Sequence, residues 1–250
     1  MVTKKASVLR ETDEDARRLA RILLRSARYA AMAVIDPDSG FPAVSRVLVG
    51  TDSDGVPVIL VSGLSAHTKA LAKDPRASLL TGEPGKGDPL AYPRLGVECL
   101  AEEVASDTPQ HRRVRERFLA RHAKAKLYID FADFRFFKLH PQAASLNGGF
   151  GKAYRLAGDD LVIRSDLTEE LATRATSIVQ DLLGTYPYLA TRIAAATKLG
   201  KNHDWRIYGV DMAGFDLISG DKLLRHEFEQ ALHTPEELAS IVAKIANPVP

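Results

Sequence analysis

The chain has 250 residues, a formal net charge of +2 at pH 7 and one cysteine. This length suits one large domain or two modest ones, and so small a charge gives no indication of a nucleic-acid-binding surface. The lone Cys99 excludes a disulfide framework and a cysteine-rich metal site. No run approaches eighteen apolar residues, so we expect a cytoplasmic protein with neither nucleic-acid nor membrane partners.

The first periodic segment, residues 12–28, is predicted to be a helix. Thr12 can cap its start, and an apolar face is made by Leu19, Ile22 and Leu23. Another face is basic and carries Arg17, Arg18, Arg21, Arg25 and Arg28. We interpret the basic face as solvated and paired within the helix, in preference to a surface for RNA or a membrane. A strand follows over residues 29–35.

Residues 41–82 are the stretch around which the rest of the chain is organised. Residues 41–49 alternate and are rich in β-branched side chains, which predicts a strand. A turn at Asp52-Ser53-Asp54-Gly55 leads to a second strand over 56–61. Ser65 is predicted to cap a helix that stops before Pro75, and residues 77–81 return as a strand.

Polar side chains gather in this same stretch. They are Ser45 and Arg46 on the first strand, Ser62 at the end of the second, and Ser65, His67, Thr68 and Lys69 at the helix start. A helix N-terminus favours an anion, and a guanidinium together with an ammonium suits a phosphate. On the residues alone, a phosphate site and a simple capped helix with solvated cations both stay open.

The next part of the chain is predicted to continue the sheet. Its elements are a loop over 83–93, a strand over 94–104 with a buried, unreactive Cys99, a helix over 109–122 and an aromatic strand over 134–139. His111 and His122 on the helix lack metal-binding spacing, so we expect no metal site there. His140-Pro141 is expected to end the aromatic strand. The glycine cluster at 148–151 is either a turn or a close contact to a ligand.

The pattern changes around Gly158-Asp159-Asp160, where we place a domain boundary. The predicted order beyond it is two helices (168–183 and 188–199), three strands (205–210, 214–218 and 222–228) and a last helix from Pro235 to Ala246, capped by Thr234. Its three histidines, His203, His226 and His233, are interpreted as surface or capping residues.

Two separated motifs resemble the pyridoxamine 5′-phosphate oxidase-like family of FMN-binding split barrels, in its heme-utilisation (HugZ-type) branch. The first is similar to S-x-L-x-x-H-T-x-N-L-x-x-D-P-R-x-S-L-L, from Ser62 to Leu80, with Ala70 in the place of the Asn. The second is Gly148-Gly149-Phe150-Gly151-Lys152-Ala153. Trp205, Gly209-Val210-Asp211 and Gly214-Phe215 are similar to the signature of the small C-terminal domain in that branch.

The resemblance implies an α+β fold, an antiparallel split β-barrel over residues 1–157 followed by a small α+β domain over 158–250. It also implies a homodimer. If FMN binds, Arg46 and Lys69 would neutralise its phosphate, the hydroxyls would come from Ser62, Ser65 and Thr68, and the backbone of Val47 and Leu48 would line the flavin. His67 is the one titratable group placed to act, and no catalytic residue is assigned. In heme-degrading relatives the glycine cluster lies near heme, which makes Lys152 and Tyr154 candidates there.

The first functional hypothesis is therefore an FMN-binding oxidoreductase whose substrate is unknown. The alternatives are a heme-binding or heme-degrading protein of iron utilisation, and a non-catalytic binding protein on the same scaffold. Relatives in the heme branch usually carry His-Met-Asn-x-x-His at the start of the second C-terminal helix, where this chain has no histidine between Thr185 and Leu189. FMN is accordingly the first cofactor we expect, and heme the alternative.

Overall fold

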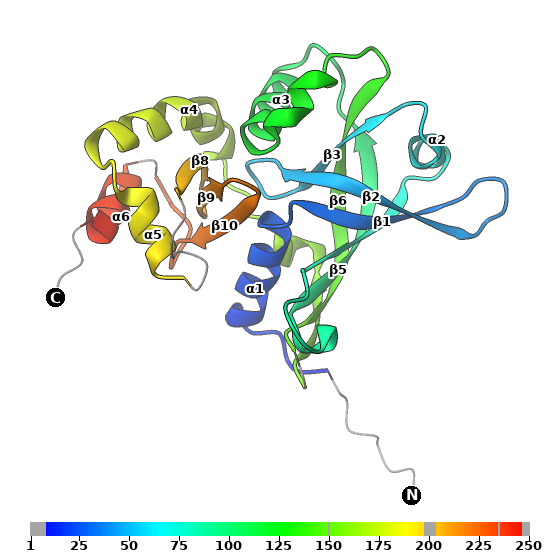
Figure 1. The fold of residues 1–250 in the computed structure, drawn as a ribbon, viewed down its shortest axis with the longest axis horizontal. Helices are drawn as coiled ribbons and strands as arrows, with labels where there is room; N and C mark the ends of the chain where they lie inside the picture. Colours follow the sequence, from blue (N-terminus) through cyan, green and yellow to red (C-terminus); the bar gives the residue numbers. More distant parts are fainter. Residues whose placement is uncertain (1–8, 150, 198–203, 235, 247–250) are drawn as a thin grey trace, which may run out of the picture.

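The computed structural model describes residues 9–149, 151–197, 204–234 and 236–246, which form two packed units (Figure 1). The N-terminal unit is built on an antiparallel sheet in the order β3-β2-β1-β4-β5-β6-β7. Its strands are β1 (Tyr29–Ile35), β2 (Pro42–Thr51), β3 (Pro57–Ser62), β4 (Arg76–Thr81), β5 (Arg94–Glu103), β6 (Phe134–Asn147) and β7 (Ala153–Ala157). β3 also pairs with β6, which closes the first six strands into a barrel and confirms the predicted split-barrel α+β fold.

β6 is longer than the sequence predicts. We expect His140-Pro141 to end this strand, and that prediction is wrong, because the strand continues to Asn147. The register with β5 shifts here: Cys99 pairs with Pro141 and Glu98 with Ala143, so Gln142 is the extra residue of a β-bulge. A bulge accommodates proline, which has no N–H to give to the ladder. The residues of β6 beyond the bulge pair with β5 and β7, whereas the pairing with β3 uses residues 134–138 at the start of the strand.

Three helices pack on the barrel: α1 (Glu14–Arg25), α2 (Ala66–Lys73) and α3 (Pro109–Arg121). α1 begins after Asp13, whose carboxylate accepts a hydrogen bond from the Ala16 N–H at 2.8 Å, so the predicted cap at Thr12 is one residue early. α2 begins after Ser65, as predicted, but the Ser65 hydroxyl makes no bond to a helix N–H group. Short 3-10 turns lie at Pro89–Ala91, Ala123–Leu127 and Gly158–Leu161.

The barrel core is filled from alternate strand positions. Its fully buried side chains include Met32, Val49, Ile59, Leu79, Leu95, Leu139 and Leu146. Cys99 lies among them, and burial raises the pKa of its thiol to about 12. The thiol therefore stays protonated at neutral pH, which agrees with the predicted unreactive cysteine.

The C-terminal unit has its own sheet and its own core. Its elements are α4 (Thr168–Thr185), α5 (Leu189–Ala195), β8 (Arg206–Asp211), β9 (Gly214–Ser219), β10 (Lys222–Glu227) and α6 (Glu237–Ala246), in the predicted order. The sheet order is β10-β9-β8, and its core includes Phe215, Leu217, Leu224 and Phe228. The predicted first position of the last helix, Pro235, lies outside the described residues. Within the described ranges, no helix is both long and apolar enough to cross a bilayer.

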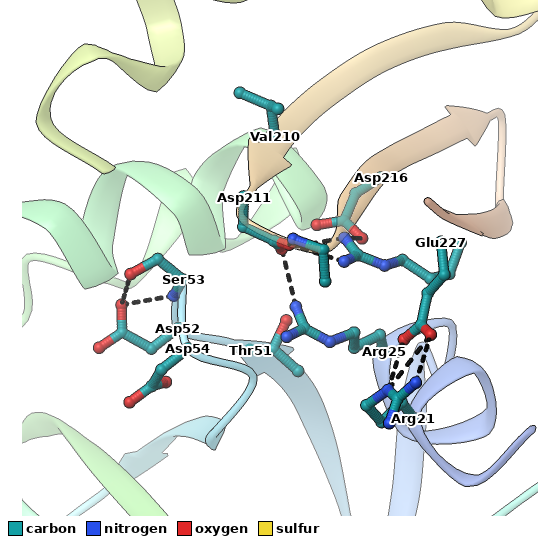
Figure 2. A network of polar contacts seen from close by, with 12 residues as sticks. Arg21, Arg25, Thr51, Asp52, Ser53, Asp54, Val210, Asp211, Asp216 and Glu227 are labelled. Atoms are coloured by element: carbon teal, nitrogen blue, oxygen red, sulfur yellow. Dashed lines mark hydrogen bonds and ion pairs between the residues drawn. The ribbon is translucent and has the colours of Figure 1, made fainter. Parts of the chain in front are cut away.

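The basic face of α1 packs against the C-terminal sheet, and α1 lies between the two units in Figure 1. Arg25 is fully buried and donates a hydrogen bond to the Asp211 carboxylate at 2.7 Å. Arg21 makes a two-nitrogen contact with Glu227, at 3.0 Å for each of the closest pairs (Figure 2). The prediction of a solvated face is therefore wrong for these two arginines, because their partners lie 186 and 206 residues further along the chain.

Two further arginines complete this network, which we call the junction network. Arg225 donates to both Asp211 and Asp216, at 2.6 and 3.0 Å, and Arg117 from α3 contacts the same two carboxylates. Burial alone would raise the pKa of Asp211, but Arg225, Arg25 and Arg117 hold it well below its ordinary value. Two buried arginines, Arg25 and Arg225, and the half-buried Arg117 thus share two buried carboxylates, and each carboxylate links the barrel helices to the C-terminal sheet.

Candidate functional site

The hydroxyl groups predicted to bind phosphate lie together at the start of α2. The Ser65 hydroxyl donates to the Ser62 carbonyl at 2.8 Å and lies 2.8 Å from the Thr68 hydroxyl. The Ser62 hydroxyl donates to Asp133 at 2.5 Å. These groups are therefore hydrogen-bonded within the protein, and a phosphate there would be held chiefly by the helix N–H groups and the exposed Lys69.

Arg46 lies apart from this cluster, on the outer face of β2. Its guanidinium carbon stands 5.1 Å from the centre of the Tyr29 ring. The two side chains line a cavity of about 420 Å³, here called the outer-face cavity, together with Ser45, Val44 and Leu80 but with no residue of α2. The Ser45 hydroxyl is buried without a hydrogen-bond partner among the described residues. The structure thus divides the predicted phosphate ligands between two places.

The remaining predicted contacts fall inside the barrel or beside α2. Val47 is a core residue, so only its backbone could meet a cofactor, whereas Leu48 is half-buried. Burial lowers the pKa of His67 below its ordinary value, so its ring is neutral at pH 7. Of the two candidates near the glycine cluster, Tyr154 is buried in the barrel core and Lys152 is exposed.

A larger cavity, of about 570 Å³, lies at the junction of the two units. We call it the junction cavity; its lining comes from α1, β10, the segment after β10 and α6. Its residues are Arg18, His226, Glu227, Phe228, Glu229, Gln230, Ala231, His233, Glu237, Ser240, Ile241, Lys244 and Ile245. This volume is within the range of small-molecule and cofactor sites.

His226 is the residue of this cavity that the sequence reasoning misread. It is half-buried within β10, so the interpretation as a capping residue is wrong. Burial lowers its pKa to about 4, helped by the neighbouring charges of Arg225 and Arg18, so its imidazole is neutral at pH 7 and keeps a free lone pair. The signal available in the sequence is the two-residue spacing of Leu224, His226 and Phe228, which places all three on one face of a strand.

The other charged groups of the junction cavity divide by role. Glu227 turns to the barrel and pairs with Arg21, whereas the Glu237 carboxylate accepts a hydrogen bond from the His233 backbone N–H at 2.9 Å. Arg18 and Lys244 add positive charge, and apolar walls come from Phe228, Ile241 and Ile245. The cavity thus combines two imidazoles and apolar side chains with two cations and three carboxylates, the third carboxylate being that of Glu229.

Comparison with known proteins places the barrel in a family. The model of the CREG β-barrel family matches residues 11–161. The chain is 32% identical over 120 residues to the chloroplastic non-canonical heme oxygenase HOZ of Arabidopsis thaliana, an alignment that covers 48% of this chain and 36% of that protein. It is 28% identical over 137 residues to the heme oxygenase HutZ of Vibrio cholerae, covering 52% and 75%. The chain thus spans about a third of the length of the first relative.

A solved structure matches both units. It is a protein of unknown function from Agrobacterium tumefaciens, which is 30% identical, superimposes with a TM-score of 0.81, and aligns over 96% of this chain and all of that one. The two units therefore occur together in another protein. With its closed six-stranded barrel and the family match over residues 11–161, this chain belongs to the CREG β-barrel family, as a split barrel of the pyridoxamine phosphate oxidase-like type with heme oxygenases among its relatives.

Proposed function

We propose that this protein binds heme and serves heme utilisation. Two relatives that match about half of the chain are heme oxygenases, which favours the heme hypothesis over the FMN-dependent oxidoreductase expected first. The observation that carries the proposal is the junction cavity, where a neutral imidazole, apolar side chains and two cations meet. Iron in heme is commonly held by histidine, and the porphyrin itself needs apolar walls and partners for its two carboxylates.

The donor set of this cavity fits heme better than that of the outer-face cavity. Arg46 and Tyr29 in the outer-face cavity offer a cation and a phenol but no imidazole. When bound, heme would supply redox and oxygen chemistry at its iron. The chain would bind the carboxylates, orient the ring and exclude water from its apolar side.

FMN is kept as a second candidate for one reason. The N-terminus of α2 has no side-chain cap, so its leading N–H groups face outward beside the exposed Lys69. A flavin phosphate there would be anchored without any residue of the junction cavity. The two candidates are therefore separable by substitutions at different sites.

The test is a paired titration of the protein with hemin and with FMN. We expect hemin to produce an intense Soret band that saturates at one equivalent per chain, and FMN to bind far more weakly. Lys69→Ala is the matched control, since it removes charge at α2 and leaves the junction cavity unchanged. Tight FMN binding that is lost in Lys69→Ala, with no Soret band on adding hemin, would overturn the heme proposal in favour of a flavoprotein.

A further inference from the structure

We propose that His226 would hold the iron of a heme bound in the junction cavity, and that Arg18 and Lys244 would pair with the heme carboxylates. This assignment rests on the proposed function and goes beyond it, because it places the heme on the C-terminal unit and names the residues that hold it. It differs from the interpretation of His226 as a surface or capping residue.

The position of His226 on β10 directs its ring into the cavity. Leu224, His226 and Phe228 share one face of the strand, and Leu224 and Phe228 belong to the core of the C-terminal unit. Arg225 and Glu227 occupy the opposite face, where they pair with Asp211 and Arg21. His226 therefore lies on the opposite face of β10 from the side chains that pair with Asp211 and Arg21, although Glu227 of the junction network lines the same cavity.

The ring of His226 is available as a ligand. It makes no hydrogen bond with any other residue in the described part of the chain, and its one ring contact is with Phe228, at 6.3 Å between centroids and 72° between planes. An imidazole that is half-buried yet lacks a hydrogen-bond partner, and that borders a cavity of about 570 Å³, fits a role in binding a guest molecule.

The other described histidines are less suited. The ring of His122 lies 2.9 Å from the Val49 carbonyl, and that of His140 lies 2.7 Å from Glu102. His111 packs edge-on against Phe136, and neither it nor His67 lines the junction cavity. His203 lies outside the described residues. His233 lines the same cavity, but it is exposed, so it is the residue against which His226 has to be compared.

Cations complete the site from two different helices. Arg18 comes from α1 of the barrel unit, where it also donates to the Glu227 carbonyl at 2.6 Å, and Lys244 comes from α6. Guanidinium and ammonium groups are the usual partners of carboxylates. Because Arg18 belongs to the barrel unit, the site is complete only when the two units are joined, which gives the junction network a role in heme binding.

The experiment compares hemin with metal-free protoporphyrin IX in the full chain. His226→Ala should weaken hemin binding by at least about tenfold, which corresponds to about 1.4 kcal/mol, and should alter the Soret band. Protoporphyrin binding should stay within about threefold, because this ring carries no iron to ligate. The substitutions Arg18→Ala and Lys244→Ala should weaken both porphyrins alike, because both carry the carboxylates. His140→Ala is the matched control, a barrel histidine remote from the cavity.

Rescue and the contrary outcomes make the test decisive. Added imidazole should restore the Soret band of His226→Ala, and retained protoporphyrin binding shows that the variant is folded. Hemin binding that is unchanged in His226→Ala, or lost instead in His233→Ala or Arg46→Ala, would overturn the assignment and leave the heme proposal standing. An absence of hemin binding by the unaltered protein would overturn the proposed function itself.

Discussion

The junction between the two units and the outer face of the barrel differ in which side chains they bury: the junction buries charged side chains, and the outer face leaves apolar side chains exposed. At the junction, Arg25, Arg225 and Asp211 are almost completely buried, yet each charge has a partner. On the outer face, Val44 and Leu80 are apolar and remain 70% and 52% exposed. Charge is thus buried where a partner from a distant segment reaches it, and apolar surface is exposed where this chain provides no cover.

The register of the strands makes the outer face continuous. Arg46, Ala31, Leu80 and Gly96 are neighbours across β2, β1, β4 and β5. The next row is Val44, Ala33, Ser78 and Glu98, and Leu100 is exposed in the row after that. Exposed large apolar side chains gathered on one face of a sheet, here Val44, Leu80 and Leu100, commonly mark an interaction surface. The homodimer implied by the sequence resemblance would be formed there, and we propose this face as its interface.

The largest effect is expected from breaking the junction. Asp211→Ala leaves Arg25, Arg117 and Arg225 with one carboxylate fewer in a buried site, and should lower the free energy of unfolding by about 3–5 kcal/mol. Denaturant unfolding followed by circular dichroism measures this change. Asp221→Ala is the matched control, because Asp221 is 74% exposed and pairs with Arg28 at the surface; we expect a loss below about 1 kcal/mol. Equal losses in the two variants would contradict a buried network.

We expect acid pH to lower the free energy of unfolding through His122, which lies beside the same junction. Burial, followed by the charge of Arg121, lowers the pKa of His122 from 6.5 to about 4. Between these values the unfolded chain binds a proton that the folded chain does not, so stability is complete above pH 6.5 and is lost as the pH falls toward 4. From pH 7 to pH 5 we expect His122 to account for about 2 kcal/mol.

The substitution His122→Gln isolates this contribution. Glutamine does not titrate, and its amide N–H can still donate to the Val49 carbonyl that lies 2.9 Å from the histidine ring. Unfolding free energies measured at pH 7 and pH 5 should therefore differ less in the variant than in the unaltered protein. An identical pH dependence in both proteins would show that His122 is not the group responsible.

The smallest effect on stability is expected at the outer face. Leu80→Asp should change the free energy of unfolding by no more than about 0.5 kcal/mol, because the side chain is already half exposed. The same change should convert a dimer to a monomer in sedimentation experiments, since it places a charge within an apolar interface. Leu127→Asp, at a leucine that is 77% exposed elsewhere on the barrel, is the control. A sedimentation mass unaffected by Leu80→Asp would remove this face as the dimer interface.

Local sequence determined most of the elements. The alternation of β-branched residues, the turn at 52–55 and the order of the C-terminal helices and strands were all readable, because each depends on neighbours within a few residues. The resemblance of the motif from Ser62 to Leu80 also gave the family correctly. The cluster of Ser62, Ser65 and Thr68 was predictable for the same reason, as its members are consecutive along one turn and helix start.

Only the tertiary structure decided which arginines are buried, how long β6 is, and that His226 borders a cavity. The sequence of α1 alone predicts a solvated basic face, because the partners of its arginines, Asp211 and Glu227, come from the C-terminal unit. β6 continues beyond Pro141 because a β-bulge in the pairing with β5 accommodates the proline. His226 gains its cavity only when α1 and α6 close around β10. Burial and charge compensation are set by partners distant in sequence, and no local period encodes which partners those are.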